Sequence, residues 1–153
     1  MGWPPEVTTA ATTGAYQAAP NRSVSAADGV AYAYREVGEG PPLALLQHYR
    51  GNLDNWDPAL VDALAAGRRV VTFDNTGVGS TTGTTPSSIR QMARDAIAFL
   101  DAMDLGQVDL LGFSIGSFVA QEIALIRPAV VRRLVLASSA PRAPTACTAG
   151  RPR

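Results

Sequence analysis

The amino-acid sequence predicts an open, mostly parallel α/β sheet with flanking helices. The chain alternates short apolar runs of strand length with longer stretches whose apolar residues recur at helical spacing. Several of the short runs are apolar at almost every position, which is typical of parallel strands covered by helices on both faces. The 153 residues are enough for one domain with a core of its own.

The two ends of the chain differ from the middle in composition. Residues 1–21 are rich in Ala, Thr and Pro and show neither strand nor helix periodicity, so we expect a flexible leader there. The domain is expected over residues 22–140, followed by an unstructured tail over 141–153. At the start of the domain, two β-prone runs flank the turn dipeptide Asp28-Gly29, which predicts a hairpin.

The elements that follow the hairpin alternate between strand and helix. A buried strand over 43–47 precedes a helix over 57–67, in which Asp57 suits the N-cap and Gly67 suits a left-handed exit. Pro128 is expected to stop the last helix. The remaining elements are strands over 68–74, 107–113 and 132–138 and helices over 87–103 and 117–127.

Composition excludes several classes of function. Thirteen basic residues balance thirteen acidic ones and form no basic stripe, so neither nucleic acid nor an anionic membrane is an expected partner. No apolar run reaches the roughly 18 residues of a membrane span, and the N-terminus lacks the features of a secretory signal. Cytoplasmic localisation is therefore expected. The single cysteine, Cys147, excludes an internal disulfide and a cysteine-based zinc cluster.

The stretch "LLGFSIGS", residues 110–117, carries the strongest chemical signal. Ser114 stands between an apolar strand and an expected helix, within the pattern Gly-x-Ser-x-Gly. In this context the serine adopts a strained turn, and Gly112 and Gly116 allow neighbouring segments to approach closely. The amide of Ile115 then points at the place where an oxyanion would form. Ser114 is thus the candidate nucleophile.

Four segments together extend this signal over most of the chain. They are "LLQHYRGNLDNWDP" (45–58), "FDNTGVGST" (73–81), "MARDAIAFLDAMDLGQVDLLGFSIGS" (92–117) and "VAQEIALIRPAVVRRLVLASS" (119–139). In this order they resemble the N-terminal half of the α/β-hydrolase fold, in particular the small bacterial hydrolases grouped with cofactor-free haloperoxidases and esterases. The resemblance covers about residues 22–142 and implies a truncated α/β-hydrolase fold that ends after the sixth strand.

The resemblance implies roles for further residues. The second oxyanion-hole amide maps to Tyr49, with Arg50 as the alternative because the local spacing is irregular. Tyr49 stands where relatives commonly have glycine, and so does Ser117. Asp74, at the end of a strand, is expected to organise a turn rather than to act as the catalytic acid. The implied activity is hydrolysis of a small-molecule ester or related acyl compound, with neither metal nor cofactor.

The acid and base that this chemistry needs are not found where the family has them. The single histidine, His48, precedes Ser114, whereas in this fold the acid and then the histidine follow the nucleophile. We expect His48 to form local hydrogen bonds in its loop. Glu122, the one acidic residue after Ser114, is expected to be a solvated or ion-paired helix residue. The isolated chain is therefore expected to be inactive or nearly so.

Two other interpretations follow from the same residues. A non-catalytic fragment or pseudoenzyme would act by binding a partner, and an apolar strand near 133–138 at the edge of the sheet would favour self-association. A dinucleotide-binding domain is suggested by "GVGSTTG". However, its third glycine is one position late, and no acidic residue ends a following strand at the required distance.

Overall fold

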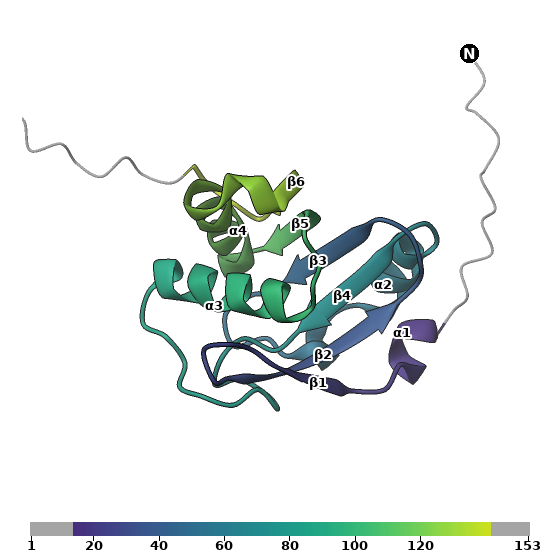
Figure 1. Cartoon of the computed structure of the whole chain (residues 1–153). Helices are drawn as coiled ribbons and strands as arrows, with labels where there is room; N and C mark the ends of the chain where they lie inside the picture. The colour runs from purple at the N-terminus through teal and green to yellow at the C-terminus, as the bar shows by residue number, and fades with distance from the viewer. Residues whose placement is uncertain (1–13, 142–153) are drawn as a thin grey trace, which may run out of the picture.

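The computed structural model describes residues 14–141, and its strands form one six-stranded sheet in the order β1-β2-β4-β3-β5-β6 (Figure 1). The strands are β1 (Arg22–Ser25), β2 (Ala31–Val37), β3 (Pro42–Leu46), β4 (Arg69–Phe73), β5 (Val108–Phe113) and β6 (Val131–Ala137). The last four of these run parallel, and β1 and β2 are antiparallel to their neighbours. The predicted fold class is confirmed.

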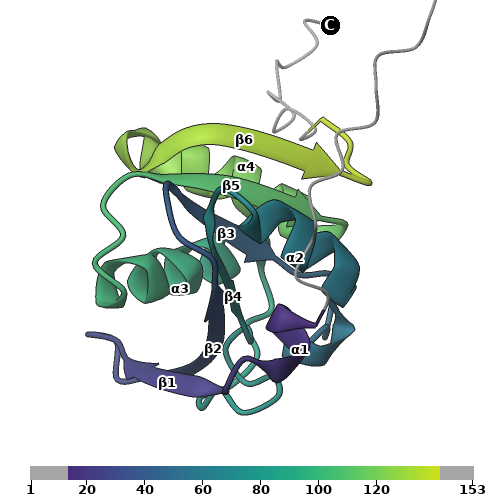
Figure 2. The same ribbon diagram turned by 90° about the vertical axis from the view of Figure 1, so that its right-hand side faces the viewer.

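Helices cover both faces of the sheet, with α1 and α2 on one face and α3 and α4 on the other (Figure 2). Their bounds are α1 (Ala15–Ala18), α2 (Pro58–Ala65), α3 (Ile89–Ala102) and α4 (Ile115–Ile126), with short 3-10 turns η1 (Leu53–Asn55) and η2 (Pro128–Val130). Among the described residues, no helix has the length and apolarity of a membrane span.

The turn and cap residues behave largely as the sequence predicts. Gly29 takes a φ of +83° in the β1–β2 turn, and the Val30 amide donates to Asp28 Oδ1 at 2.9 Å. Asp57 caps α2 by accepting from the Ala59 amide at 2.9 Å. The left-handed exit expected at Gly67 is wrong. The helix ends at Ala65, its C-cap Ala66 has right-handed geometry, and Gly67 has no positive φ, so the chain leaves the helix without a left-handed residue.

The core lies in two layers, one on each face of the sheet, and β3 contributes to both. Leu43 and Leu45 pack toward α2, whereas Ala44 and Leu46 belong to the larger layer beneath α3 and α4. All four side chains are buried. In the larger layer Phe99 of α3 stacks on Phe73 of β4 with ring centroids 4.2 Å apart. A strand apolar at every position is therefore buried on both faces, as predicted.

The flexible leader expected over 1–21 is wrong for its last residues. Tyr16 in α1 is 1 % exposed, and the Asp62 carboxylate of α2 accepts from the amides of Gly14 and Tyr16 at 2.7 and 2.8 Å. The packed domain thus includes residue 14. A single buried tyrosine creates neither strand nor helix periodicity, so the sequence pattern did not reveal this contact. Residues 1–13, and all of the expected tail except Pro141, lie outside the described residues.

A buried carboxylate joins three elements at the end of the sheet away from Ser114. Asp109 in β5 accepts from the guanidinium of Arg132 in β6 at 2.8 and 2.9 Å and also pairs with Arg68, just before β4. Hydrogen bonds from Arg132 are the largest cause that lowers the pKa of Asp109 to about 2. Burial acts in the opposite direction, and the Arg68 contact adds to the lowering.

This pKa predicts a loss of stability in acid. A carboxyl group whose pKa is lower in the folded state stabilises the fold above its ordinary pKa, and that stabilisation is lost as the pH falls from about 4 to about 2. We expect the free energy of unfolding of wild type to exceed that of Asp109→Asn by about 1 kcal/mol near neutral pH. The difference is small because both arginines remain a third exposed and are screened by solvent. Urea unfolding across this pH range measures the difference. A pH-independent difference would contradict the prediction.

Candidate active site

Ser114 alone forms the turn between β5 and α4. Its φ of 54° and ψ of −121° lie in a region that residues with a side chain rarely adopt. The helix expected from Ser117 begins instead at Ile115, because this single strained residue completes the reversal from strand to helix. Ser114 is half-buried at the carboxyl end of the parallel strands. A serine on a strained turn from strand to helix is the arrangement that a nucleophile elbow requires.

The two glycines of the motif are required by close backbone approach. A Cβ atom on Gly112 would lie 2.4 Å from the Gly116 carbonyl oxygen and 2.6 Å from the Ser117 Cα. A Cβ atom on Gly116 would lie 2.0 Å from the carbonyl oxygen of Leu46. Neither glycine has a positive φ, so the reason is space and not conformation. The elbow therefore packs directly on itself and on the end of β3.

Hydrogen bonds hold the Ser114 backbone from both sides. Its amide donates to the Ala137 carbonyl at the end of β6 at 2.9 Å. Its carbonyl accepts from the Ser117 amide at 2.9 Å and from Ser117 Oγ at 2.6 Å. Ser117, which stands where relatives commonly have glycine, thus supports the elbow. As the first residue of α4, Ile115 has an amide without an acceptor inside the helix.

Tyr49 and Ile115, the two residues expected to hold an oxyanion, line one surface pocket of about 200 Å³. Pro86, Ser87, Ser88, Ile89 and Met92 complete its lining. Tyr49 itself is 62 % exposed, and the next residue, Arg50, has a positive φ of 59°. The tertiary structure therefore brings together, around one pocket, two positions that are far apart in the sequence.

His48 forms the local contacts that the sequence predicts. Its Nδ1 lies 3.0 Å from the Tyr49 carbonyl oxygen, and its ring meets Phe113 edge-on at 6.0 Å between centroids. Since a carbonyl can only accept, Nδ1 donates in this contact. Within residues 14–141, none of the hydrogen bonds joins His48 to Ser114. This is the arrangement of a loop-shaping residue.

Asp74 connects the loop after β3 with the loop after β4. Its carboxylate accepts from the Leu53 amide at 2.8 Å and from the Ser80 amide at 3.0 Å, and it is almost fully buried. Burial raises the pKa of Asp74, and the two amide hydrogen bonds partly offset this effect. Gly79 leaves room for the carboxylate, since a Cβ atom there would lie 2.2 Å from Oδ2. The structural role predicted for Asp74 agrees with these contacts.

Sequence reasoning missed Tyr16, which supports the same loop from the other side. Its hydroxyl donates to the Leu53 carbonyl at 2.6 Å and lies 3.0 Å from Thr72 Oγ1. The Arg35 guanidinium stacks over the Tyr16 ring at 5.3 Å and pairs with Asp54 at 2.6 Å. Leu53 is thus held by its carbonyl to Tyr16 and by its amide to Asp74. No local pattern in the sequence indicates this arrangement.

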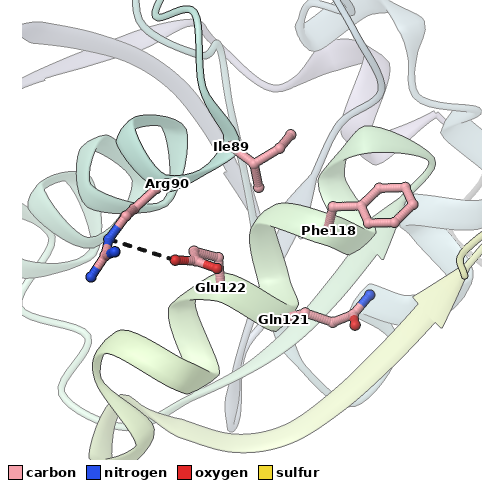
Figure 3. Close-up of a pocket in the computed structure, with 5 residues that line it drawn as sticks. All are labelled: Ile89, Arg90, Phe118, Gln121 and Glu122. Atoms are coloured by element: carbon pink, nitrogen blue, oxygen red, sulfur yellow. Dashed lines mark ion pairs between the residues drawn. The ribbon is translucent and has the colours of Figure 1, made fainter. Parts of the chain in front are cut away.

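Glu122 lies away from the elbow, in the middle of α4. It is almost fully buried, and its carboxylate faces the guanidinium of Arg90 on α3 at 3.8 Å (Figure 3). The pair lines a shallow pocket of about 140 Å³ with Ile89, Phe118 and Gln121. The expected ion-paired helix residue is therefore found, and the ion pair joins α3 to α4.

A third and more apolar pocket, of about 380 Å³, lies on the α2 face of the sheet. Its lining includes Trp56, Leu60, Leu111, Phe113 and Ala137. Trp56 Nε1 is buried and has no hydrogen-bond partner among the described residues. Phe113 and Ile115, the residues on either side of Ser114 in the chain, line this pocket and the pocket of Tyr49, respectively.

The model of the alpha/beta hydrolase fold family matches residues 41–149 of the chain. The chain belongs to the α/β-hydrolase family. The match begins just before β3 and includes the loop of Tyr49, the elbow and β6. It also includes β5, after which Ser114 stands, between β3 and β6 in the sheet. The resemblance inferred from the four sequence segments is confirmed.

Similar proteins in the α/β-hydrolase family carry different functional names. A Mycobacterium tuberculosis protein named as a non-heme bromoperoxidase is 35 % identical over 105 residues, which are 68 % of this chain and 40 % of that protein. An Azorhizobium caulinodans protein named as a carbamate hydrolase is 36 % identical over 117 residues, which are 75 % of this chain and 44 % of that protein. The structure of an α/β-hydrolase fold protein from Chitinophaga pinensis superposes with a TM-score of 0.80 at 40 % identity.

The chain spans less than half the length of these α/β-hydrolase relatives. It covers 46 % of the Chitinophaga pinensis chain, although 82 % of its own residues take part in the match. The activity and substrates of a whole family member therefore enter below as proposals.

Proposed function

We propose that Ser114 is the nucleophile of a serine hydrolase that acts on esters or related acyl compounds. The observation that supports this proposal most is the elbow itself, in which Ser114 has a φ of 54° and both flanking glycines pack against backbone. A structural turn has no need of this strain, whereas a nucleophile must project its hydroxyl from the sheet. The name of the carbamate hydrolase relative extends the acyl compounds to carbamates.

The proposed reaction follows from the positions of these groups. Ser114 Oγ attacks the carbonyl carbon of the substrate and passes its proton to a base. The oxyanion accepts hydrogen bonds from the amides of Ile115 and Tyr49. Collapse of this intermediate breaks the bond to the alcohol, which takes up the proton and leaves an acyl group on Ser114. Water then releases the acid and restores the serine.

We further propose that the isolated chain is slow because it lacks a well-placed base. The chain contains one histidine, and His48 contacts Tyr49 and Phe113 instead of the Ser114 hydroxyl. Oxyanion binding and positioning without a full triad retain about 10³–10⁴ of rate enhancement over water. Detectable but weak reactivity at Ser114 is therefore the expected behaviour.

The first test is covalent labelling with an alkyl fluorophosphonate. Ser114 Oγ displaces fluoride from phosphorus, so labelling should disappear in Ser114→Ala and persist in Ser23→Ala, which removes an exposed hydroxyl on β1. Free imidazole should accelerate labelling if a missing base limits the rate. If His48 supplies the base, His48→Ala should slow labelling and imidazole should have little effect on wild type. Circular dichroism confirms that each variant is folded.

A second candidate is a non-catalytic protein that acts by binding a partner. The position of the only histidine supports this alternative, because it leaves Ser114 without a hydrogen-bonded base. Equal labelling of folded wild type and Ser114→Ala, with or without imidazole, would refute the hydrolase proposal and support the binding function.

A further inference from the structure

The loop of Tyr49 is built on one tight turn, which runs from His48 to Gly51. A hydrogen bond from the Gly51 amide to the His48 carbonyl, at 3.1 Å, closes this turn. Inside it, Arg50 has a φ of 59°, a left-handed conformation that is unfavourable for a residue with a side chain. Such a conformation persists only where the surrounding structure holds it. The turn therefore needs support from neighbouring residues.

Gln47 supports the first peptide group of this turn. Its side chain is almost fully buried, and Oε1 accepts from the His48 amide at 2.9 Å. Nε2 is also buried and has no hydrogen-bond partner within residues 14–141. In this part of the chain, the bond from His48 is therefore the one hydrogen bond that orients the carboxamide.

Gly51 lets the end of the turn pack on the same side chain. A Cβ atom on Gly51 would lie 2.3 Å from Gln47 Cγ and 2.9 Å from Gln47 Cδ. A third contact, with His48 Cε1 at 3.0 Å, is one that a small shift of the ring would relieve. Gly51 has no positive φ, so the requirement for glycine is one of space. The Gln47 side chain thus contacts the turn at both ends.

The backbone of Gln47 lies against the elbow. A Cβ atom on Gly116, the second residue of α4, would lie 2.8 Å from the Gln47 carbonyl oxygen. Gln47 therefore contacts the turn with its side chain and the start of α4 with its backbone. The amides of Tyr49 and Ile115 belong to these two elements.

We propose that Gln47 is a positioning residue for the oxyanion hole. Its carboxamide holds the turn so that the Tyr49 amide keeps its place relative to the Ile115 amide. This role rests on the proposed hydrolase function of Ser114. A misplacement of about 1 Å can lower the rate of an enzyme about a hundredfold. Loss of the hydrogen bond from His48 should therefore slow the attack by Ser114 without unfolding the protein.

Gln47→Met tests the hydrogen bond, and Gln47→Glu tests its rescue. Methionine has a similar length but no strong acceptor, whereas glutamate keeps an oxygen for the His48 amide in either protonation state. With imidazole supplied as the base, fluorophosphonate labelling of Gln47→Met should be at least about tenfold slower than that of wild type. Gln47→Glu should recover most of the rate. Gln107→Met, the same change at an exposed glutamine before β5, should keep the wild-type rate.

Two further measurements separate positioning from a general loss of structure. Urea unfolding of Gln47→Met should stay close to that of wild type, because the substitution removes an unpartnered buried donor together with one hydrogen bond. Amide hydrogen exchange at His48 should be faster in Gln47→Met than in wild type and close to wild type in Gln47→Glu. The exchange measurement does not require any reaction at Ser114.

A double substitution tests whether Gln47 and Gly51 act together. Gly51→Ala should slow labelling at least about tenfold, because the added Cβ atom displaces the Gln47 side chain. Gln47→Ala removes Cγ and Cδ, the atoms that this Cβ would meet. The variant with both substitutions should therefore label no more slowly than Gln47→Ala alone. Losses that multiply would contradict the contact between the two residues.

The outcomes distinguish this role from the function on which it rests. Absence of Ser114-dependent labelling in wild type would refute the hydrolase proposal and this role with it. Ser114-dependent labelling at equal rates in wild type and Gln47→Met would overturn the role of Gln47 alone. Folded Gln47→Glu that labels as slowly as Gln47→Met, or unchanged exchange at His48 in Gln47→Met, would overturn it as well.

Discussion

Gly116→Ala should destabilise the fold by about 3 kcal/mol, although alanine is the better helix former. The added Cβ atom would lie 2.0 and 2.6 Å from the Leu46 carbonyl oxygen and carbon and 2.8 Å from the Gln47 carbonyl oxygen. All three are backbone atoms at the end of β3, so no side chain can rotate to make room. Either α4 or the end of β3 must move, and both support the elbow.

Gly67→Ala provides the matched control. Gly67 is exposed, has no positive φ, and has no heavy atom within 4 Å of a Cβ built on it. The same substitution there should be neutral or stabilise by about 0.5 kcal/mol through the unfolded state. Urea unfolding compares the two variants directly. Similar stability of Gly116→Ala and Gly67→Ala would contradict the contact between α4 and the end of β3.

Gly116→Ala should also lower the reactivity of Ser114. A shift of α4 relative to β3 changes the distance between the Ile115 amide and the loop of Tyr49, which line one pocket. We therefore expect fluorophosphonate labelling of folded Gly116→Ala to fall at least tenfold, whereas Gly67→Ala should keep the wild-type rate. Labelling at the wild-type rate in Gly116→Ala would show that the close approach serves stability alone.

Tyr16→Ala should lower the free energy of unfolding by about 4 kcal/mol, within the range found when a large aromatic side chain in a core is truncated. Tyr16 is 1 % exposed, and its hydroxyl joins α1 to the Leu53 carbonyl and to Thr72. Truncation opens a cavity beneath α2 and leaves the Leu53 carbonyl without its donor. A flexible leader would instead tolerate the change within about 0.5 kcal/mol.

One variant separates packing from hydrogen bonding at Tyr16, and a second, at an exposed tyrosine, is its control. Tyr16→Phe keeps the ring and should cost about 1–2 kcal/mol through the unpaired carbonyl. Tyr49→Ala, at a tyrosine that is 62 % exposed, should leave stability nearly unchanged. Hydrogen exchange adds a local measurement. In Tyr16→Phe the Leu53 amide should exchange faster than in wild type, and amides of α3 should not. Equal protection of Leu53 in both proteins would contradict its support by Tyr16.

The sequence by itself determined the alternation of strands and helices and the position of the elbow. β3 and β5 are recognisable because apolar residues at successive positions require cover on both faces. The elbow is recognisable because Gly112, Ser114 and Gly116 act within a few residues of one another. Asp57 as the N-cap of α2 is a signal of the same local kind. Each of these predictions depends on neighbours along the chain.

The tertiary structure alone decided which distant residues support the site. Tyr16 and Leu53 are 37 positions apart, and Leu53 and Asp74 are 21 positions apart, yet these three form one connection behind the loop of Tyr49. The reason Gly116 must be glycine also lies elsewhere, in the backbone of β3. A sequence pattern records periodicity and turn chemistry. The surroundings of a side chain depend on how the sheet brings separate segments together, and one sequence does not show this.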